Sequence, residues 1–268
     1  MNFYQGKSAL VMGGSEGIGL AVALEFVIQG SHVTVCSRHP DKLKKALQIM
    51  ETSRVDQQQR LSTQSVDVTD YASTSRRLES ILGHDGPPEF LINSAGVARP
   101  GYLEDLAMSD IRQMMELNYF GTVNAIKAVF PAMRRAGKGH IVNVSSMAGY
   151  LGLFGYTGYC ASKYAVIGFS EALRHEAKPY GIHVSVLCPP NTKTPGLERE
   201  NQKKPKEVLK MEEKAKTSDP QTVAKALLRA LPRRPFLINP TLDSKLIYAA
   251  SRLLPSSLKD YLLRRPLQ

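Results

Sequence analysis

The sequence predicts a single α/β domain built on a doubly wound, seven-stranded parallel sheet with helices on both faces. Two observations lead to this prediction. Short runs of apolar, β-branched residues alternate with stretches of helical periodicity along the chain. The stretches between these runs are long enough to be crossover helices, which implies parallel strands joined in right-handed βαβ units. Because the expected strands are uniformly apolar, the sheet should be covered on both faces.

The first expected strand, 7–11, leads into a glycine cluster, and a helix from Gly17 to Gly30 follows before the second strand, 32–36. The remaining strands are expected at 61–66, 89–92, 140–144, 183–187 and 236–238. Asp41 begins the stretch after the second strand, where it is expected to be a helix N-cap. The chain has 268 residues, of which 43% are hydrophobic and 22% charged, so it is long and apolar enough for one large globular domain.

Two segments near the end of the chain depart from the alternation. Residues 193–220 are rich in Lys, Glu and Pro and have little apolar periodicity, which indicates a partly mobile substrate lid. Residues 241–268 are expected to form a basic amphipathic extension, interrupted at Pro255. Its apolar residues recur at helical spacing: Leu246, Ile247, Ala250, Leu254, Leu258, Tyr261 and Leu262. From residue 229 onward there are eight Lys or Arg and two acids, a net charge of +6.

The whole chain has a formal charge of +11, which favours phosphate-bearing partners without choosing among a nucleotide, an anionic membrane and a nucleic acid. The start of the chain has no pattern of a secretory signal, and no uncharged apolar run approaches the ~18 residues of a membrane span. Cys36, Cys160 and Cys188 are scattered and odd in number, which favours core positions and a reducing, cytoplasmic location.

A glycine-rich turn joins the first strand to the first helix. Glycines at Gly13, Gly17 and Gly19 allow a sharp turn, a close backbone approach to a pyrophosphate and tight helix packing, and Ser15 and Ile18 lie between them. The free amides at the helix N-terminus then face the anion. A tight structural turn is the alternative. In this position the turn predicts a dinucleotide-binding domain of the Rossmann type over residues 1–268.

The end of the second strand indicates which dinucleotide binds. An acid there would bind the ribose 2′-hydroxyl of NAD, whereas a cation suits the 2′-phosphate of NADP. This chain has Ser37 and Arg38, which offer a hydroxyl and a fork of guanidinium donors. The expected cofactor is therefore NADP, bound as NADPH. The alternatives are that Arg38 is a solvated loop cation and that Glu16, in the glycine turn, opposes phosphate binding.

Tyr159 and Lys163 are four residues apart at the start of an expected helix, so they project from the same face. A lysine ammonium near a phenol favours the phenolate, so we expect a lowered pKa for Tyr159 and proton transfer at neutral pH. Ser145 and Ser146 end the fifth expected strand, at the edge where doubly wound sheets bind ligands. Asn118 lies in the preceding helical segment. The alternative for the tyrosine and lysine is an amphipathic pair on a surface helix.

Taken together, these motifs resemble the short-chain dehydrogenase/reductase family from about residue 7 to 240. The matching features also include Asp67-Val68, Asn93-Ser94-Ala95-Gly96 and the segment from Pro189 to Thr194. The resemblance implies that Tyr159 is the general acid in carbonyl reduction, that Ser146 binds the substrate oxygen, and that Lys163 binds the nicotinamide ribose and lowers the pKa of Tyr159. It implies that Asn118 holds a water in the proton relay. The cofactor-binding residues that it implies are Gly13, Ser15, Gly17, Ile18, Gly19, Ser37, Arg38, Asp67, Val68, Asn93, Tyr159, Lys163, Pro189, Thr192 and Thr194.

Three residues depart from the usual pattern of the family: Met12, Ser94 and Pro190. None of them lies on the implied proton path, so an active enzyme is expected. A narrower resemblance, in residues 152–159 and from Glu171 to Gly196, is to family members that reduce the 3-keto group of long-chain sphingoid bases. Eukaryotic members carry an N-terminal membrane anchor, which this chain is expected to lack. The resemblance also implies a homo-oligomer, either dimer or tetramer.

Several alternatives stay open. The substrate could instead be a steroid, a retinoid or a 3-oxoacyl group, and the protein could instead be a non-catalytic NADP-binding sensor. The basic extension either contacts an anionic membrane peripherally or packs on the domain or a second subunit. A nucleic-acid partner is not expected, because the basic residues are not interleaved with stacking aromatics. The six histidines show no ligand spacing, so no metal site is assigned.

Overall fold

Seven parallel strands form one sheet in the order β3-β2-β1-β4-β5-β6-β7 in the computed structural model, which describes residues 2–213 and 216–255. All six pairings between neighbours are parallel. The order changes direction between β1 and β4, which opens a crevice at the carboxyl ends of these strands. The predicted doubly wound sheet is therefore confirmed. Its strands are β1 (Ser8–Met12), β2 (His32–Ser37), β3 (Leu61–Ser65), β4 (Phe90–Asn93), β5 (Gly139–Val144), β6 (Ile182–Leu187) and β7 (Leu237–Ile238).

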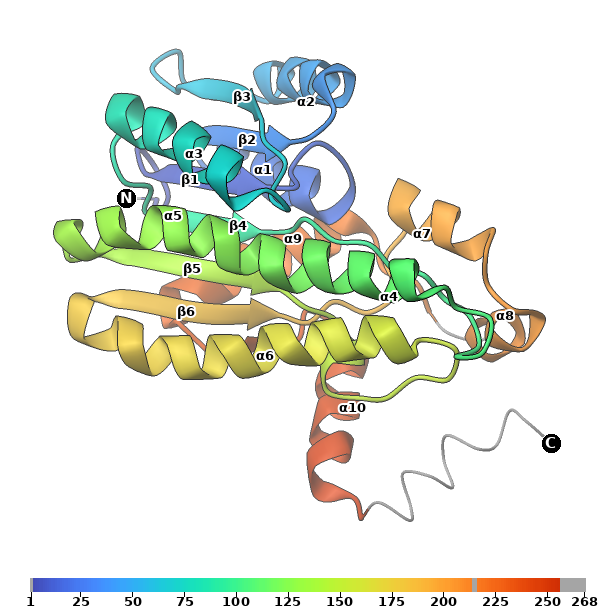
Figure 1. Ribbon diagram of the computed structural model, residues 1–268. Coiled ribbons are helices and arrows are strands. Elements are labelled where there is room, and N and C mark those ends of the chain that lie inside the picture. The colour runs from blue at the N-terminus through green and yellow to red at the C-terminus, as the bar shows by residue number, and fades with distance from the viewer. Residues whose placement is uncertain (1, 214–215, 256–268) are drawn as a thin grey trace.

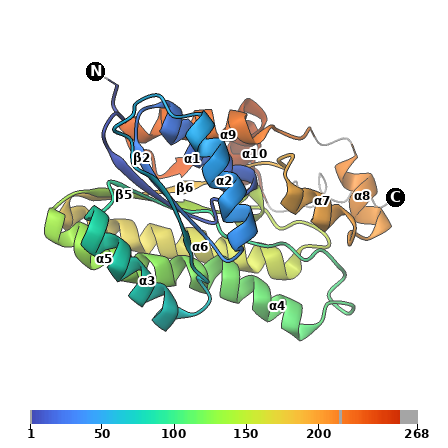
Figure 2. The same ribbon diagram turned by 90° about the horizontal axis from the view of Figure 1, so that it is seen from above.

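Helices cover both faces of the sheet, as Figures 1 and 2 show. On one face, apolar side chains of α1 (Gly17–Ile28), α2 (Pro40–Thr52) and α9 (Pro220–Ala230) pack against the strands. On the other face, α3 (Tyr71–Asp85), α5 (Gly121–Ala136) and α6 (Thr157–Ala177) form a second core with the sheet. The two layers bury both surfaces of the central strands, which explains why those strands are apolar at nearly every position.

The remaining elements lie in the connections. Before α5 the chain forms α4 (Met108–Met115) and a π-helical turn at Glu116–Phe120, and after β6 it forms α7 (Pro195–Asn201) and α8 (Lys206–Glu212). The last described helix is α10 (Leu242–Leu253). Single turns of 3₁₀-helix occur at Met147–Gly149, Lys178–Tyr180 and Leu231–Arg233.

No end of an expected strand differs from the observed end by more than one residue. A larger difference concerns α1, which ends at Ile28 because Gly30 has φ +84° and supports the turn into β2. The prediction that Asp41 caps α2 is wrong. His39 occupies the N-cap position, Pro40 begins the helix, and Asp41 lies in the first turn, where a carboxylate still stabilises the positive end of the helix.

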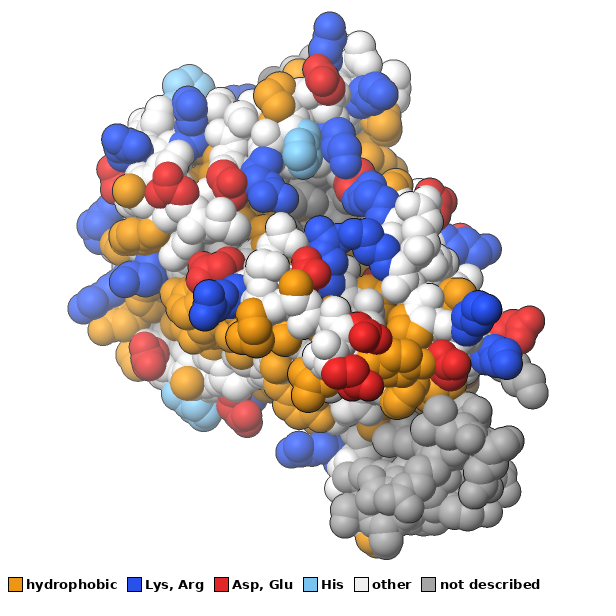
Figure 3. Space-filling view, turned by 45° about the vertical axis from the view of Figure 1, so that its right-hand side comes forward, with side chains coloured by type: hydrophobic (Ala, Val, Ile, Leu, Met, Phe, Trp, Pro, Cys, Tyr) orange, Lys and Arg blue, Asp and Glu red, His pale blue; other side chains and the backbone are white. Residues whose placement is uncertain are grey.

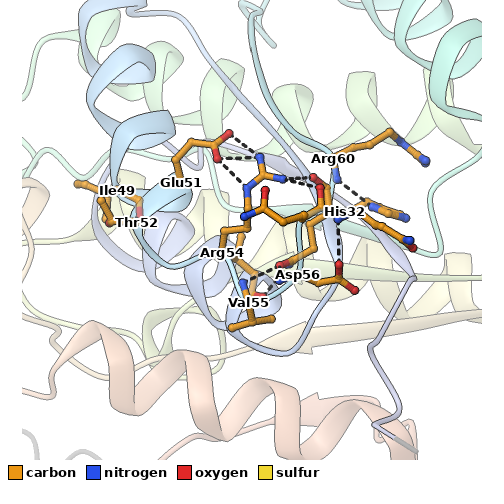
Figure 4. Close-up of polar contacts among 12 residues, drawn as sticks. His32, Ile49, Glu51, Thr52, Arg54, Val55, Asp56 and Arg60 are labelled. Carbon is orange, nitrogen blue, oxygen red and sulfur yellow. Dashed lines mark hydrogen bonds and ion pairs between the residues drawn. The ribbon is translucent and has the colours of Figure 1, made fainter.

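A polar cluster fixes the connection from α2 to the edge strand β3 (Figure 4). Arg54 donates to both carboxylate oxygens of Glu51, at 2.8 Å each, and also to the backbone carbonyl of Gln59. The amide of Arg60 donates to His32 Nδ1 over 3.0 Å. These contacts lie at the amino ends of β2 and β3, away from the crevice, and hold the edge strand in register.

The expected lid contains more regular structure than its composition indicates. Between residues 193 and 213 it forms α7 and α8, and Pro220 already begins α9. Thr194 caps α7 by accepting a hydrogen bond from the amide of Leu197. In the extension, α10 starts with a capping box between Thr241 and Ser244. The expected apolar positions Leu258, Tyr261 and Leu262 lie outside the described residues.

Candidate active site

A cleft of about 570 Å³ opens at the carboxyl ends of the strands. One end lies at the turn between β1 and α1, and the other lies at the first turn of α6, beside residues of α7 and α8. It brings together most of the residues that the sequence assigned to a site. Its lining includes Gly13, Ser15, Gly17, Ile18, Gly19, Ser37, Arg38, Val68, Ser146, Tyr159, Lys163, Pro189, Thr192 and Thr194.

The glycine turn has the shape that a dinucleotide phosphate requires. Gly13 has φ +75°, and a Cβ there would collide with the backbone of Ala95. A Cβ on Gly19 would collide with the carbonyl of Gly13. Only glycine can occupy these two positions, because the backbone packs so closely there. The turn borders the cleft at the N-terminus of α1, where free amides can bind an anion.

The end of β2 presents polar and basic groups to the same cleft. Ser15 donates to Ser37 across 2.8 Å, which ties the glycine turn to this strand. The guanidinium of Arg38 lies beside the cleft and is 3.9 Å from Asp67 Oδ2. Asp67 itself does not line the cleft, and its side chain contacts Arg38; its contact with a cofactor stays a prediction.

Glu16 is neutralised by two cations. Lys42 of α2 lies 2.7 Å from one carboxylate oxygen, and Arg199 of α7 pairs with the other. Burial pushes the pKa of Glu16 upward, but the hydrogen bonds from Lys42 and Arg199 outweigh it, so the pKa lies below its usual range. Glu16 therefore does not leave an uncompensated negative charge in the turn.

Lys163 lies below Tyr159 on the same face of α6, as predicted. Its side chain is buried, and Nζ donates to the carbonyl of Val144 over 3.0 Å. Nζ is 5.7 Å from the centre of the Tyr159 ring. Burial lowers the pKa of Lys163 to about 8. Gly96 leaves the space beside this ammonium, because a Cβ there would lie 3.3 Å from Nζ and 3.2 Å from Asn118 Oδ1.

The expected lowering of the Tyr159 pKa is wrong for this structure. Burial is the largest influence and raises the pKa above its usual range, and the carboxylate of Glu200 raises it further. A hydrogen bond with Ser146 opposes this only in part. Desolvation dominates because it disfavours the charged form of each group, the phenolate as well as the ammonium. Tyr159 therefore stays protonated at neutral pH, which is the state that a proton donor requires.

Asn118 lies behind Tyr159 and Lys163 and outside the cleft lining. It occupies the π-helical turn between α4 and α5, a local geometry that is frequent at functional sites. Its side chain accepts from the amide of Val97 over 2.8 Å and donates to Ser162 Oγ over 2.9 Å. Ser162 in turn donates to the carbonyl of Tyr159. The amide of Asn118 thus connects the loop after β4 to the first turns of α6.

Asn93 also lies outside the cleft lining. Its side chain is buried and donates to Asn143 over 2.8 Å, so it joins the ends of β4 and β5. Its Oδ1 atom has no hydrogen-bond partner among the described residues. Ser145 is also structural, because its hydroxyl donates to the backbone of Lys163.

Sequence reasoning missed a polar group at the lid end of the cleft. Tyr156, Glu200 and Glu212 all line the cleft near Tyr159, and the buried Lys204 lies between the two carboxylates. These residues come from the loop before α6 and from the lid, where composition indicates only a solvated segment. The space that Gly96 leaves beside Lys163 was also missed. The available signal was its place in the loop after β4, within the motif Asn93-Ser94-Ala95-Gly96.

The comparisons with known proteins agree with this geometry. The family model described as short chain dehydrogenase matches residues 7–205. The chain belongs to the short-chain dehydrogenase family. It is therefore an oxidoreductase acting on alcohol and carbonyl groups, and the expectation drawn from the motifs is confirmed at the level of the family.

Named relatives within the family cover most of the chain. The 3-ketodihydrosphingosine reductase of Bos taurus is 40% identical over 225 residues, which are 84% of this chain and 68% of that one. The enzyme of the same name from Dictyostelium discoideum is 35% identical over 241 residues, which are 85% of this chain and 72% of that one.

Solved structures match the fold over almost the whole length. A short-chain dehydrogenase/reductase from Burkholderia phymatum in complex with NAD aligns with a TM-score of 0.82 at 23% identity, over 98% of this chain and 97% of that chain. A short-chain dehydrogenase from Sphingobium yanoikuyae in complex with NADPH has a TM-score of 0.78 at 25% identity, over 91% of each chain.

Proposed function

We propose that this protein reduces the 3-keto group of a long-chain sphingoid base to a secondary alcohol, with NADPH as the reductant. One observation carries the proposal: Tyr159, Ser146 and Lys163 share a single cleft with a glycine turn that can accept a pyrophosphate. The similarity to relatives named 3-ketodihydrosphingosine reductase supports this choice of ketone. The roles of the site residues are part of the proposal.

The residues of the cleft fit a nicotinamide dinucleotide. Gly13 and Gly19 let the turn pack closely against the loop after β4 and against itself, and the free amides at the start of α1 lie at this turn. Ser37 and Arg38 would hold a 2′-phosphate, and Lys163 would hold the nicotinamide ribose. When bound, the cofactor supplies the hydride that the protein's own side chains cannot supply.

Tyr159 and Ser146 stabilise the negative charge that develops on the substrate oxygen. The Tyr159 hydroxyl donates its proton to the carbonyl oxygen as that oxygen becomes an alkoxide, and the Ser146 hydroxyl donates a hydrogen bond to the same atom. Lys163, fixed by the Val144 carbonyl, places a positive charge beside the phenol. The described side chains hold these donors in place before the reaction, so little reorganisation is needed when the oxygen becomes negative.

The proposal also covers the substrate lid, the membrane contact, the location and the oligomeric state of the protein. Residues 193–220 act as the substrate lid, and α10 contacts an anionic membrane surface, where long-chain substrates reside. Among the described residues, no helix combines the length and apolar character needed to cross a bilayer. A cytoplasmic location suits the free, buried thiols of Cys36, Cys160 and Cys188. Assembly as a homo-oligomer completes the proposal.

The deciding experiment is NADPH oxidation followed over a panel of carbonyl compounds. The panel contains 3-ketodihydrosphingosine, a steroid ketone, retinal and a 3-oxoacyl thioester. We expect the sphingoid ketone to give the highest kcat/KM and the product to be the 3-hydroxy base. Turnover of another member of the panel with a higher kcat/KM would transfer the proposal to that substrate, and binding of NADPH without turnover of any ketone would favour a sensor.

A further inference from the structure

The lid brings two carboxylates into the cleft that the proton transfer does not use. Tyr156 Oη lies 2.6 Å from Glu200 Oε1 and 2.8 Å from Glu212 Oε1. A tyrosine hydroxyl has one proton and can donate it to only one of these carboxylates at a time. One carboxylate oxygen therefore faces the hydroxyl oxygen with no hydrogen atom between them. This wall of the cleft therefore lacks one hydrogen-bond donor.

The charged side chains of the same wall do not balance either, because negative groups outnumber positive ones. Lys204 Nζ is 3.2 Å from Glu200 Oε1 and 2.6 Å from Glu212 Oε2, and its side chain is fully buried, with an exposed fraction of 0%. Its third hydrogen goes to Asn201 Oδ1 over 2.7 Å. Asn191, which also lines the cleft, donates a neutral hydrogen bond to Glu212. Two carboxylates and one ammonium leave one negative charge in a wall whose carboxylate side chains are only 17% and 22% exposed, and buried charges are costly unless paired.

This wall adjoins the reacting groups. The ring centres of Tyr156 and Tyr159 are 6.0 Å apart, and both rings line the cleft together with Glu200. The carboxylate of Glu200 is close enough to act electrostatically on the Tyr159 phenol. A cation bound at Glu200 and an oxygen bound at Tyr159 can therefore belong to one small head group. On the face shown in Figure 3, basic and acidic side chains are interspersed, and hydrophobic side chains are most frequent in the lower middle.

We propose that Glu200, supported by Glu212, binds the protonated amino group that a sphingoid base carries on the carbon next to its ketone. The inference rests on the proposed function and names how the same cleft selects its substrate. The ammonium supplies the missing positive charge, and it places the neighbouring carbonyl at Tyr159 and Ser146. A 3-oxoacyl chain offers no cation to this wall, so the wall favours the amine over that class.

The test compares 3-ketodihydrosphingosine with its 2-deamino analogue, which keeps the chain, the 1-hydroxyl and the ketone but has no charge. In the unmodified protein we expect kcat/KM to favour the amine by roughly tenfold or more. Glu200→Gln should raise KM for the amine by at least roughly tenfold and lower the ratio of kcat/KM for the amine to kcat/KM for the deamino ketone by the same factor, because any effect of Glu200 on Tyr159 is common to both ketones. Glu198→Gln is the matched control, because Glu198 lies on α7 and is exposed, and it should change neither substrate.

Each other outcome has a definite meaning. Equal losses on both ketones would make Glu200 a structural residue and overturn the inference. If the unmodified protein reduces both ketones with the same kcat/KM, the proposed function holds and the amine-binding role alone fails. If it reduces neither, both fail. Thermal unfolding and NADPH binding report whether Glu200→Gln folds, and Glu212→Gln carries the same comparison should it not.

Discussion

Tyr159 and Lys163 show how burial sets the protonation states on which the proposed reaction depends. Attraction between a phenolate and an ammonium would favour both charged forms, yet burial shifts both groups toward the neutral form. For reduction this arrangement is useful, because the phenol has to begin with its proton. Lys163, with its pKa lowered to about 8, is still mostly charged at neutral pH and can stabilise the phenolate that forms.

Replacing Tyr159 tests the proton donor directly. Tyr159→Phe removes one hydroxyl from α6 and leaves the glycine turn and Arg38 in place. We expect kcat to fall by roughly 10²–10⁴-fold, the usual contribution of a positioned acid, while the Kd of NADPH stays nearly constant. Steady-state kinetics and a fluorescence titration with NADPH measure the two quantities. Unchanged turnover would remove Tyr159 from the mechanism.

Replacing Arg38 tests the choice of cofactor. Arg38→Ala removes the guanidinium at the end of β2 and should raise KM for NADPH by roughly tenfold or more, because charge-assisted hydrogen bonds to a phosphate are lost. KM for NADH should change little. Arg60→Ala is the control, because Arg60 is exposed at the other end of the sheet. An unchanged ratio of the two Michaelis constants would exclude Arg38 from the recognition of NADPH.

At the scale of elements, the lid is attached to the glycine turn by one ion pair. Arg199 of α7 reaches Glu16, which also holds Lys42 of α2, so three segments meet at one carboxylate. A second attachment comes from Thr194, whose side chain lies against Gly17. The position of α7 thus depends on whether the turn keeps its shape, which couples the dinucleotide end of the cleft to the substrate end.

We expect Arg199→Ala to loosen α7 without unfolding the domain. The pair is partly exposed, so its loss should cost only ~0–1 kcal/mol of global stability. Amide hydrogen exchange of residues 195–201 should become faster, whereas exchange in α6 should not change. Glu198→Ala, a neighbouring exposed substitution on the same helix, should leave both rates as they are. Equal exchange in all proteins would show that the ion pair does not hold the lid.

At the scale of the whole molecule, α10 lies outside the doubly wound core and exposes apolar side chains to solvent. Leu246 is 60% exposed and Leu253 82% exposed, and Leu242 and Ile247 are exposed beside them. Lys245 and Arg252 lie on the same helix. A helix with apolar and basic side chains in contact with solvent has the character of an interfacial segment. It lies at the lower edge of the molecule in Figure 1, next to the end of the sheet that carries β6 and β7.

The membrane proposal predicts that vesicles containing anionic lipid co-sediment the protein and that neutral vesicles do not. Leu246→Ser with Leu253→Ser should abolish this binding, and raised salt should weaken it. Ile49→Ser, on the exposed face of α2, is the control substitution. Co-sedimentation unchanged by the double substitution would contradict the proposal. A lower mass of the double variant in solution would instead assign α10 to a subunit contact.

The sequence by itself determined the sheet, the glycine turn and the placement of the tyrosine and lysine of the proposed catalytic site on one helix face. These features are local, because apolar periodicity, glycine spacing and a four-residue separation on one helix each follow from backbone geometry within a short segment. The positions of Gly13 and Gly19, of Arg38 after β2, and of Tyr159 and Lys163 on α6 could all be predicted in this way.

Only the tertiary structure decided the protonation states and the composition of the substrate wall. The pKa of Tyr159 depends on how much water the lid and the loops exclude, and no short segment encodes that quantity. Tyr156, Glu200 and Glu212 are up to 56 residues apart in the chain, and α7 and α8 bring them together. Their charges act through space at distances that the fold alone fixes, so their roles become visible only after folding.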